Sequence, residues 1–200
     1  AFTGVDHVDL DAAREMGVAV SNAAGYSEQS VAELVVGQMI HLLRNVPAVE
    51  NRCRNGGTKD GLVGNELGSS VVGIVGVGAI GSRVAALCRP LTPETRGLIG
   101  REQLALMKPS AYLINMARGP VVDVQAVADA LNQGKIAGAA IDVFEKEPPL
   151  NADEPLLHAK NCLLTPHIAF ASHQSMERRA RIVFDSLQQW MNGHQVNKIL

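Results

Sequence analysis

The chain has 200 residues, of which 46% are hydrophobic and 19% charged, and its formal net charge at pH 7 is −2. This composition is ordinary for a globular protein that buries a sizeable core. The small net charge argues against nucleic acid or an anionic membrane as partner, and no apolar run approaches the roughly 18 residues of a membrane span. The three cysteines lack metal-ligand spacing and are typical of reduced, semi-buried thiols, so we expect a cytoplasmic protein.

The first elements are short. Residues 9–16 predict a helix that ends before Gly17, and the apolar residues 18–20 predict a short buried strand. A chain that opens on a turn and a short helix reads as the middle of a domain.

A longer helix follows. It begins at Ser27 or at Ser30, where Glu33 would complete a capping box. Its apolar residues recur at helical spacing, which indicates core packing. We expect it to end near Asn45, because Pro47 breaks or kinks a helix.

A glycine-rich linker over residues 55–64 precedes the most informative stretch. The apolar run 71–75 predicts a strand, Gly76-x-Gly78-x-x-Gly81 a tight turn, and the residues after it a helix. This is the context of a dinucleotide-binding fingerprint, in which a pyrophosphate approaches the glycine backbone at the helix start.

The stretch after the fingerprint helix departs from the expected order. A second strand should end in an acidic residue about 20 positions beyond the glycines, where it would bind the adenosine ribose. The proline-rich residues 88–96 stand there instead. We reject Glu94 as the ribose ligand because it lies in a proline-flanked turn, and we reject Arg96 as an NADP signal for the same reason.

The second half of the chain alternates strands and helices, which predicts an α/β fold with a doubly wound parallel sheet. The expected strands are 111–115, 136–143 and 162–165. The expected helices are 101–107, 124–132 and a long final helix from Ser172 to about residue 192.

Polar residues follow three of these strands, at the sheet edge where open α/β folds bind ligands. They are Arg118, Glu147 and His167. Each alone is typical of a surface or turn residue. Together they suit hydride transfer to a 2-keto acid: imidazole donates a proton to the carbonyl oxygen, a carboxylate orients the imidazole, and a guanidinium binds the substrate carboxylate.

The chain also resembles the D-isomer-specific 2-hydroxyacid dehydrogenase family, and within it the glycerate dehydrogenase/hydroxypyruvate reductase-like members. The matching stretches are TGVDHVDLDAA, SVAEL, VGIVGVGAIG, PLTPETRGLIG, LINMARGPVVD, GAAIDVFEKEPP and LTPHIAFAS. The resemblance implies a homodimeric enzyme that uses NAD or NADP and acts on a small 2-keto or D-2-hydroxy acid.

The resemblance also implies roles for individual residues. Arg118 would orient the substrate carboxylate, His167 would be the acid/base, and Glu147 would be its partner. The implied cofactor-binding residues are Thr3, Gly76, Gly78, Ala79, Ile80, Gly81, Met116, Ala117, Arg118, Asp142 and His167.

The domain organisation implied by the resemblance has four parts. Residues 1–26 would be a remnant of a flavodoxin-like substrate domain and 27–65 an interdomain helix and linker. Residues 66–170 would form the Rossmann-like dinucleotide-binding domain, and 171–200 a helix returning to the substrate domain.

Two segments that the family normally has are missing from this sequence. One precedes TGVDHVD, and the other, about forty residues or two βα units, lies between about Cys88 and Leu91. Deleting the internal segment would remove central strands and the adenosine pocket. We therefore expect the biological chain to contain more than these 200 residues, and a break in the backbone at residues 88–91.

Two alternatives stay open. A dinucleotide-sensing co-repressor on the same scaffold would keep the same three polar residues. A formate or phosphite dehydrogenase would share the fold; the formate enzymes pair the histidine with glutamine, so Glu147 argues against them, and phosphite remains possible.

Overall fold

The computed structural model describes residues 3–74, 78–80, 99–146 and 150–200, and divides into two compact units. One unit comprises residues 1–30 and 170–200, and the other residues 31–169. The predicted break at residues 88–91 lies outside the described residues.

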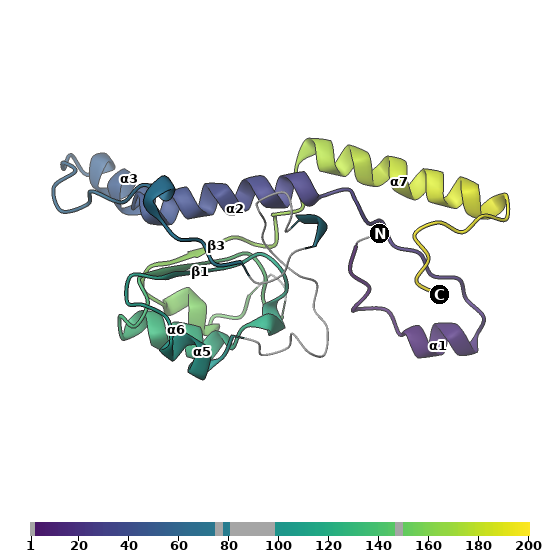
Figure 1. Ribbon diagram of the computed structural model, residues 1–200, viewed down its shortest axis with the longest axis horizontal. Coiled ribbons are helices and arrows are strands. Elements are labelled where there is room, and N and C mark those ends of the chain that lie inside the picture. The colour runs from purple at the N-terminus through teal and green to yellow at the C-terminus, as the bar shows by residue number, and fades with distance from the viewer. Residues whose placement is uncertain (1–2, 75–77, 81–98, 147–149) are drawn as a thin grey trace. The chain divides into compact units, whose positions relative to one another are not determined.

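The larger unit is built on a parallel sheet of three strands in the order β1-β2-β3 (Figure 1). The strands are β1 (Tyr112–Asn115), β2 (Gly138–Ile141) and β3 (Cys162–Leu164). Leu113 pairs with Ala139, and Ile141 pairs with Leu164. The predicted α/β class with a parallel sheet is confirmed, although β2 is shorter than the expected 136–143.

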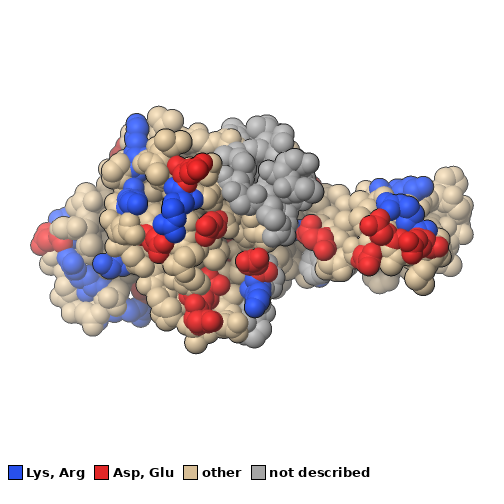
Figure 2. Space-filling view, turned by 90° about the horizontal axis from the view of Figure 1, so that it is seen from below, with Lys and Arg blue, Asp and Glu red and all other residues tan. Residues whose placement is uncertain are grey.

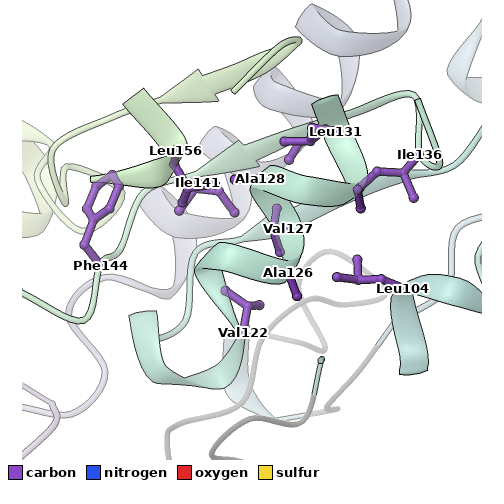
Figure 3. Packing of buried hydrophobic residues seen from close by; sticks show 12 residues of the cluster. Leu104, Val122, Ala126, Val127, Ala128, Leu131, Ile136, Ile141, Phe144 and Leu156 are labelled. Carbon is purple, nitrogen blue, oxygen red and sulfur yellow. The ribbon is translucent and has the colours of Figure 1, made fainter. Parts of the chain in front are cut away.

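One face of this sheet is covered by α6 (Val124–Asn132) and the short α5 (Arg101–Ala105). Asp123 caps α6, since its side chain accepts a hydrogen bond from the Ala126 amide at 3.0 Å. Figure 3 shows the resulting core, in which apolar side chains of α6 meet β2 and the 3-10 turn Pro155–His158. Its buried members include Leu104, Val127, Leu131, Ile141, Phe144 and Leu156.

The opposite face of the sheet packs against α2 (Glu28–Leu43), which lies along it in Figure 1. Successive strand residues point to opposite faces, so Ala139 and Ile141 contact the α6 core while Ala140 contacts the α2 side. The α2-side cluster contains Val31, Val35, Met39, Met116, Ala140 and Ala169. The sheet is therefore covered on both faces, as the doubly wound pattern requires.

The start and end of α2 differ partly from expectation. The helix begins directly after Ser27, so Ser30 lies in its first turn and the capping box of Ser30 is wrong; the Ser30 hydroxyl instead donates to the Ser27 carbonyl at 3.1 Å. Pro47 does not simply end the helix but stands in the first turn of α3 (Val46–Arg54), where a missing N–H costs nothing. Residues 55–64 form the predicted loop.

The described part of the fingerprint strand, residues 71–74, is not in a strand, and this prediction is wrong. Val71 is fully exposed, and only Ile74 packs against the α2-side cluster. A strand forms only when a neighbour pairs with it, and within the described residues no strand pairs with residues 71–74. A 3-10 turn, Leu67–Ser69, precedes this stretch.

The smaller unit contains α1 (Leu10–Glu15) and the long α7 (His173–Met191). The expected strand at 18–20 is absent; Val18 is exposed, and Ser21 forms a single antiparallel bridge with Lys198. With one short partner segment there is no sheet to extend. Ser172 caps α7 as predicted, accepting from the Ser175 amide at 3.1 Å.

The described surface carries mixed charges, and Figure 2 shows acidic and basic side chains interspersed on the face in view. No helix in the described part of the chain is long and apolar enough to cross a membrane. Of the cysteines, Cys53 is exposed and Cys162 is partly buried, while Cys88 lies outside the described residues. Burial raises the pKa of the Cys162 thiol to about 12, which keeps it protonated.

Candidate active site

Three adjacent parallel strands deliver three of the predicted site residues to one edge of the sheet. Asp142 directly follows β2, while Arg118 and His167 each lie three residues beyond the ends of β1 and β3. Since β2 pairs with both neighbours, the turns after all three strands start side by side. This is the carboxyl edge, where ligands bind in folds of this type.

The turn after β1 is organised by Asn115, the last residue of that strand. Its buried side chain donates from Nδ2 to the Arg118 carbonyl at 3.0 Å and accepts at Oδ1 from the Ala117 amide at 3.1 Å. Its own carbonyl accepts from the Asp142 amide at 3.0 Å. Asn115 therefore holds the backbone of Arg118 and ties it to β2.

Asp142 does the same for the turn after β3. Its side chain is completely buried, and Oδ1 accepts from the Thr165 hydroxyl at 2.6 Å and the Ile168 amide at 2.9 Å. Oδ2 accepts from the Ala169 amide at 2.9 Å. All three hydrogen bonds run to residues that flank His167, so this carboxylate shapes the turn.

His167 itself has a positive φ of 53°, a conformation that is uncommon for residues other than glycine. Its amide donates to the Asp142 carbonyl at 2.8 Å, and its side chain is half-buried. The dense bonding of Asp142 around it supplies the contacts that maintain such a conformation.

Arg118 is also half-buried, and its Nη1 donates to the Ala117 carbonyl at 2.8 Å. Next to it, Met116 is buried in the cluster under α2. In this turn the Met116 side chain is anchored in the core, and two residues later the half-buried guanidinium of Arg118 lies at the carboxyl edge of the sheet.

Three residues of the predicted cofactor turn are described. Gly78 is exposed, and a Cβ placed on it would meet nothing within 4 Å. Ala79 and Ile80 are helical, and Ile80 packs against the α2-side cluster. Open space above a glycine backbone at a helix start is what an approaching pyrophosphate needs.

Four other predicted site residues lie outside the described part of the larger unit. Gly76, Gly81 and Glu147 lie outside the described residues. Thr3 belongs to the smaller unit, where its carbonyl accepts from Asn22 Nδ2 at 3.0 Å.

A shallow apolar pocket of about 150 Å³ lies beside the turn after β3. Its lining residues are Phe144, Leu150, Leu164, Thr165 and Pro166. Neither Arg118 nor His167 lines it, so it borders the candidate site without forming its polar part.

Two organising residues escaped the sequence reasoning, Asn115 and Thr165. The available signal for Asn115 was its position as a side-chain amide at the end of an apolar strand. A polar side chain buried there needs hydrogen-bond partners, and the following turn can supply them. Thr165 directly follows β3, but no sequence pattern links it to Asp142, which lies 23 residues earlier.

Comparison with known proteins shows which family the chain belongs to. Residues 36–90 and 86–169 match, as two segments, the sequence model of the D-isomer specific 2-hydroxyacid dehydrogenase, NAD binding domain. The chain belongs to the D-isomer specific 2-hydroxyacid dehydrogenase family. The resemblance read from the motifs is thereby confirmed.

Similar members of this dehydrogenase family have several names. D-3-phosphoglycerate dehydrogenase of Methanocaldococcus jannaschii is 34% identical, over all of this chain and 46% of its own length. Glyoxylate reductase of Thermofilum pendens is 33% identical, over 95% of this chain and 70% of its own. The structure of D-lactate dehydrogenase from Aquifex aeolicus, complexed with NAD and lactic acid, matches with a TM-score of 0.88 and 28% identity, covering 96% of this chain and 75% of that one.

The chain spans about half the length of the phosphoglycerate dehydrogenases that it matches. The alignment with the Methanocaldococcus protein extends over 244 residues although this chain has 200, so that relative carries additional positions within the aligned region.

Proposed function

We propose that this protein is an NAD(P)-dependent oxidoreductase that interconverts a small 2-keto acid and its D-2-hydroxy acid. The observation that carries the proposal is the shared anchoring of the Arg118 and His167 turns on the two sides of Asp142. Family membership supports the same reaction class, and relatives are named glyoxylate reductase and hydroxypyruvate reductase.

In this proposal Arg118 binds the substrate carboxylate through its planar guanidinium, which can form two parallel hydrogen bonds. His167 donates a proton to the carbonyl oxygen as negative charge develops there, and removes it in the reverse direction. Glu147 orients the imidazole. Asn115 and Asp142 hold the backbone around Arg118 and His167, so that these two turns need little reorganisation during the reaction.

The residues present fit a dinucleotide at the fingerprint. The backbone of Gly78 is open and directly precedes the helical residues 79–80, and a helix start favours a bound pyrophosphate. Met116 and Ala117 would lie along the nicotinamide half. When bound, the nicotinamide supplies the hydride.

The direct test is NADH oxidation, followed at 340 nm, by the full-length protein with hydroxypyruvate, glyoxylate and pyruvate. We expect turnover of at least one acid. Replacing the acid/base in His167→Asn should lower kcat by about 10²–10⁴-fold. Arg118→Lys should mainly raise KM for the acid, because an ammonium cannot form the bidentate pair.

His158→Asn is the matched control. His158 lies in the same unit, in the 3-10 turn before β3 begins, and its ring is hydrogen-bonded to the Ala152 carbonyl. It should react like the unmodified protein. If NADH binds but none of the three acids reacts, the enzyme proposal fails and the co-repressor-like alternative is favoured; capture of a protein partner that depends on NADH would then test it.

The expected cytoplasmic homodimer remains part of the proposal, and light scattering measures its assembly.

A further inference from the structure

Gly119, the residue after Arg118, is packed directly against another segment of backbone. It is buried and begins the 3-10 turn Gly119–Val121. A Cβ placed on it would lie 2.0 Å from the Phe144 carbonyl carbon, 2.2 Å from the Phe144 oxygen and 2.4 Å from the Glu145 nitrogen. All three atoms belong to one peptide group, so no side-chain rotation could make room for a methyl group.

This contact joins the turn that carries Arg118 to the segment after β2, and that segment is in turn hydrogen-bonded to the turn that carries His167. On one side is the turn after β1, in which Arg118 directly precedes Gly119. On the other side is the segment that begins at Asp142. The Asp142 carbonyl accepts from the His167 amide, and the Asp142 carboxylate accepts from the amides of the two residues that follow His167. The spacing between Gly119 and the Phe144–Glu145 peptide therefore influences the spacing between Arg118 and His167.

We propose that Gly119 is a positioning residue: its lack of a side chain lets the Arg118 turn rest on the Phe144–Glu145 peptide, and this contact sets the distance between the substrate-binding guanidinium and the His167 turn. The inference rests on the proposed function of those two residues. Gly119 is required for the space it leaves, since its φ is not positive and other residues can adopt its backbone conformation.

Gly138 provides a matched comparison. It lies at the start of β2, the opposite end of the sheet from the site. A Cβ there would lie 3.0 Å from the Asn161 carbonyl oxygen and 3.1 Å from the Tyr112 ring. Gly138→Ala should therefore perturb the same sheet without altering the Arg118 turn.

The experiment compares Gly119→Ala and Gly138→Ala at a temperature where both are folded by circular dichroism, using NADH with the three acids named above. In Gly119→Ala we expect kcat/KM to fall about 100-fold, because a shift of about 1 Å in a site residue has this effect. KM for the acid should rise. A merely structural role would lower the folded fraction and hence apparent kcat, without changing KM.

Gly138→Ala should keep KM and kcat/KM near the unmodified values. Wild-type-like kinetics in Gly119→Ala, or an equal rise of KM in both variants, would overturn the proposal.

Native-state amide exchange on the unmodified protein tests the coupling if Gly119→Ala does not fold, or if the protein turns over none of the acids. The Val122 amide donates to the Gly119 carbonyl, and the His167 amide donates to the Asp142 carbonyl. Turns that are coupled through Gly119 should open together, so both amides should exchange with the same opening free energy. Clearly different values would refute the coupling, while absence of turnover alone counts against the proposed function.

Discussion

At the scale of single residues, two buried polar side chains shape the candidate site more than its exposed groups do. Asn115 and Asp142 use their hydrogen-bonding atoms on backbone amides, a carbonyl and one hydroxyl. A buried polar group is costly unless it is bonded, so such residues favour one conformation of the turns over others. Their hydrogen bonds run to the backbone around Arg118 and His167.

Removing the Asn115 side chain should affect both stability and substrate binding. In Asn115→Ala the Arg118 carbonyl and the Ala117 amide lose their partner, and we expect a loss of about 1–3 kcal/mol in unfolding free energy. Urea denaturation measures this loss. Because the Arg118 backbone is released, KM for the acid should also rise in steady-state assays.

Asn132→Ala is the control for that experiment. Asn132 is exposed, and its Oδ1 accepts from the Lys160 amide at 3.1 Å, just before β3 begins rather than at the carboxyl ends of the strands. Its removal should cost less stability and leave KM unchanged. Equal effects of both variants on KM would contradict the role given to Asn115.

At the scale of elements, α6 is the main support of the sheet on its side. Five of its nine residues are buried, so its apolar face is the inner one. Leu131 is 3% exposed, whereas Leu106, just after α5, is 87% exposed. Leu131→Ala should lower the unfolding free energy by about 2–5 kcal/mol, through lost burial and the cavity that remains.

Leu106→Ala makes the same chemical change without a cavity. Its unfolding free energy should stay within about 0.5 kcal/mol of the unmodified protein. Thermal or urea unfolding of the two variants checks the difference. If both variants lost the same stability, the packing assigned to α6 would be wrong.

Asp129 links α6 to α5 and gives this pair of helices a pH dependence. Its carboxylate accepts from Gln125 Nε2 and from Arg101 Nη2, both at 3.0 Å. These bonds, the one from Gln125 first, lower the pKa of Asp129 below its ordinary value. Because the folded-state pKa lies below the unfolded one, the stabilisation is present above about pH 4 and is lost as pH falls through the folded-state value.

NMR titration of the Asp129 carboxyl carbon should therefore give a lower midpoint in the folded protein than in the unfolded protein. In Asp129→Asn the loss of stability on acidification should be smaller than in the unmodified protein. An unshifted midpoint would show that the two hydrogen bonds contribute nothing in solution.

At the scale of the whole molecule, the family match breaks where the sequence reasoning located a missing segment. The two matched segments meet at residues 86–90, and the alignment with one relative is longer than this chain. Both findings support the proposal that the biological protein carries additional residues between about Cys88 and Leu91. Residues 71–74 agree with it, because no strand in the described part of the chain pairs with them.

Peptide mapping of the protein from its natural source tests that proposal. Trypsin does not cut efficiently before proline, so a continuous chain would yield one peptide from Val84 to Arg96 across the Arg89–Pro90 bond. We expect this peptide to be absent, while peptides from both sides of it are found. Detection of the 84–96 peptide would establish that the chain is continuous there.

Much of the fold followed from local patterns. Alternating apolar runs and amphipathic helices in residues 101–192 predicted the parallel sheet and its helical layers, since the period of apolar residues depends on which face is buried. Once the apolar runs had been assigned to strands, the polar residues that follow them could be predicted to lie at the strand ends. Predictions were wrong at residues 18–20 and 71–74, where the described residues offer a local β pattern no strand to pair with.

By itself, the sequence determined the α/β class, the family and the residue types that stand after each strand, because these depend on spacing along the chain. Only the tertiary structure decided how the turns are held: Asn115 on the Arg118 backbone, Asp142 and Thr165 around His167, and Gly119 against Phe144. The Asn115 side-chain bonds are local, but the Asp142 and Gly119 contacts join positions that are distant in sequence, and such hydrogen bonds and close packing exist only once the strands lie side by side.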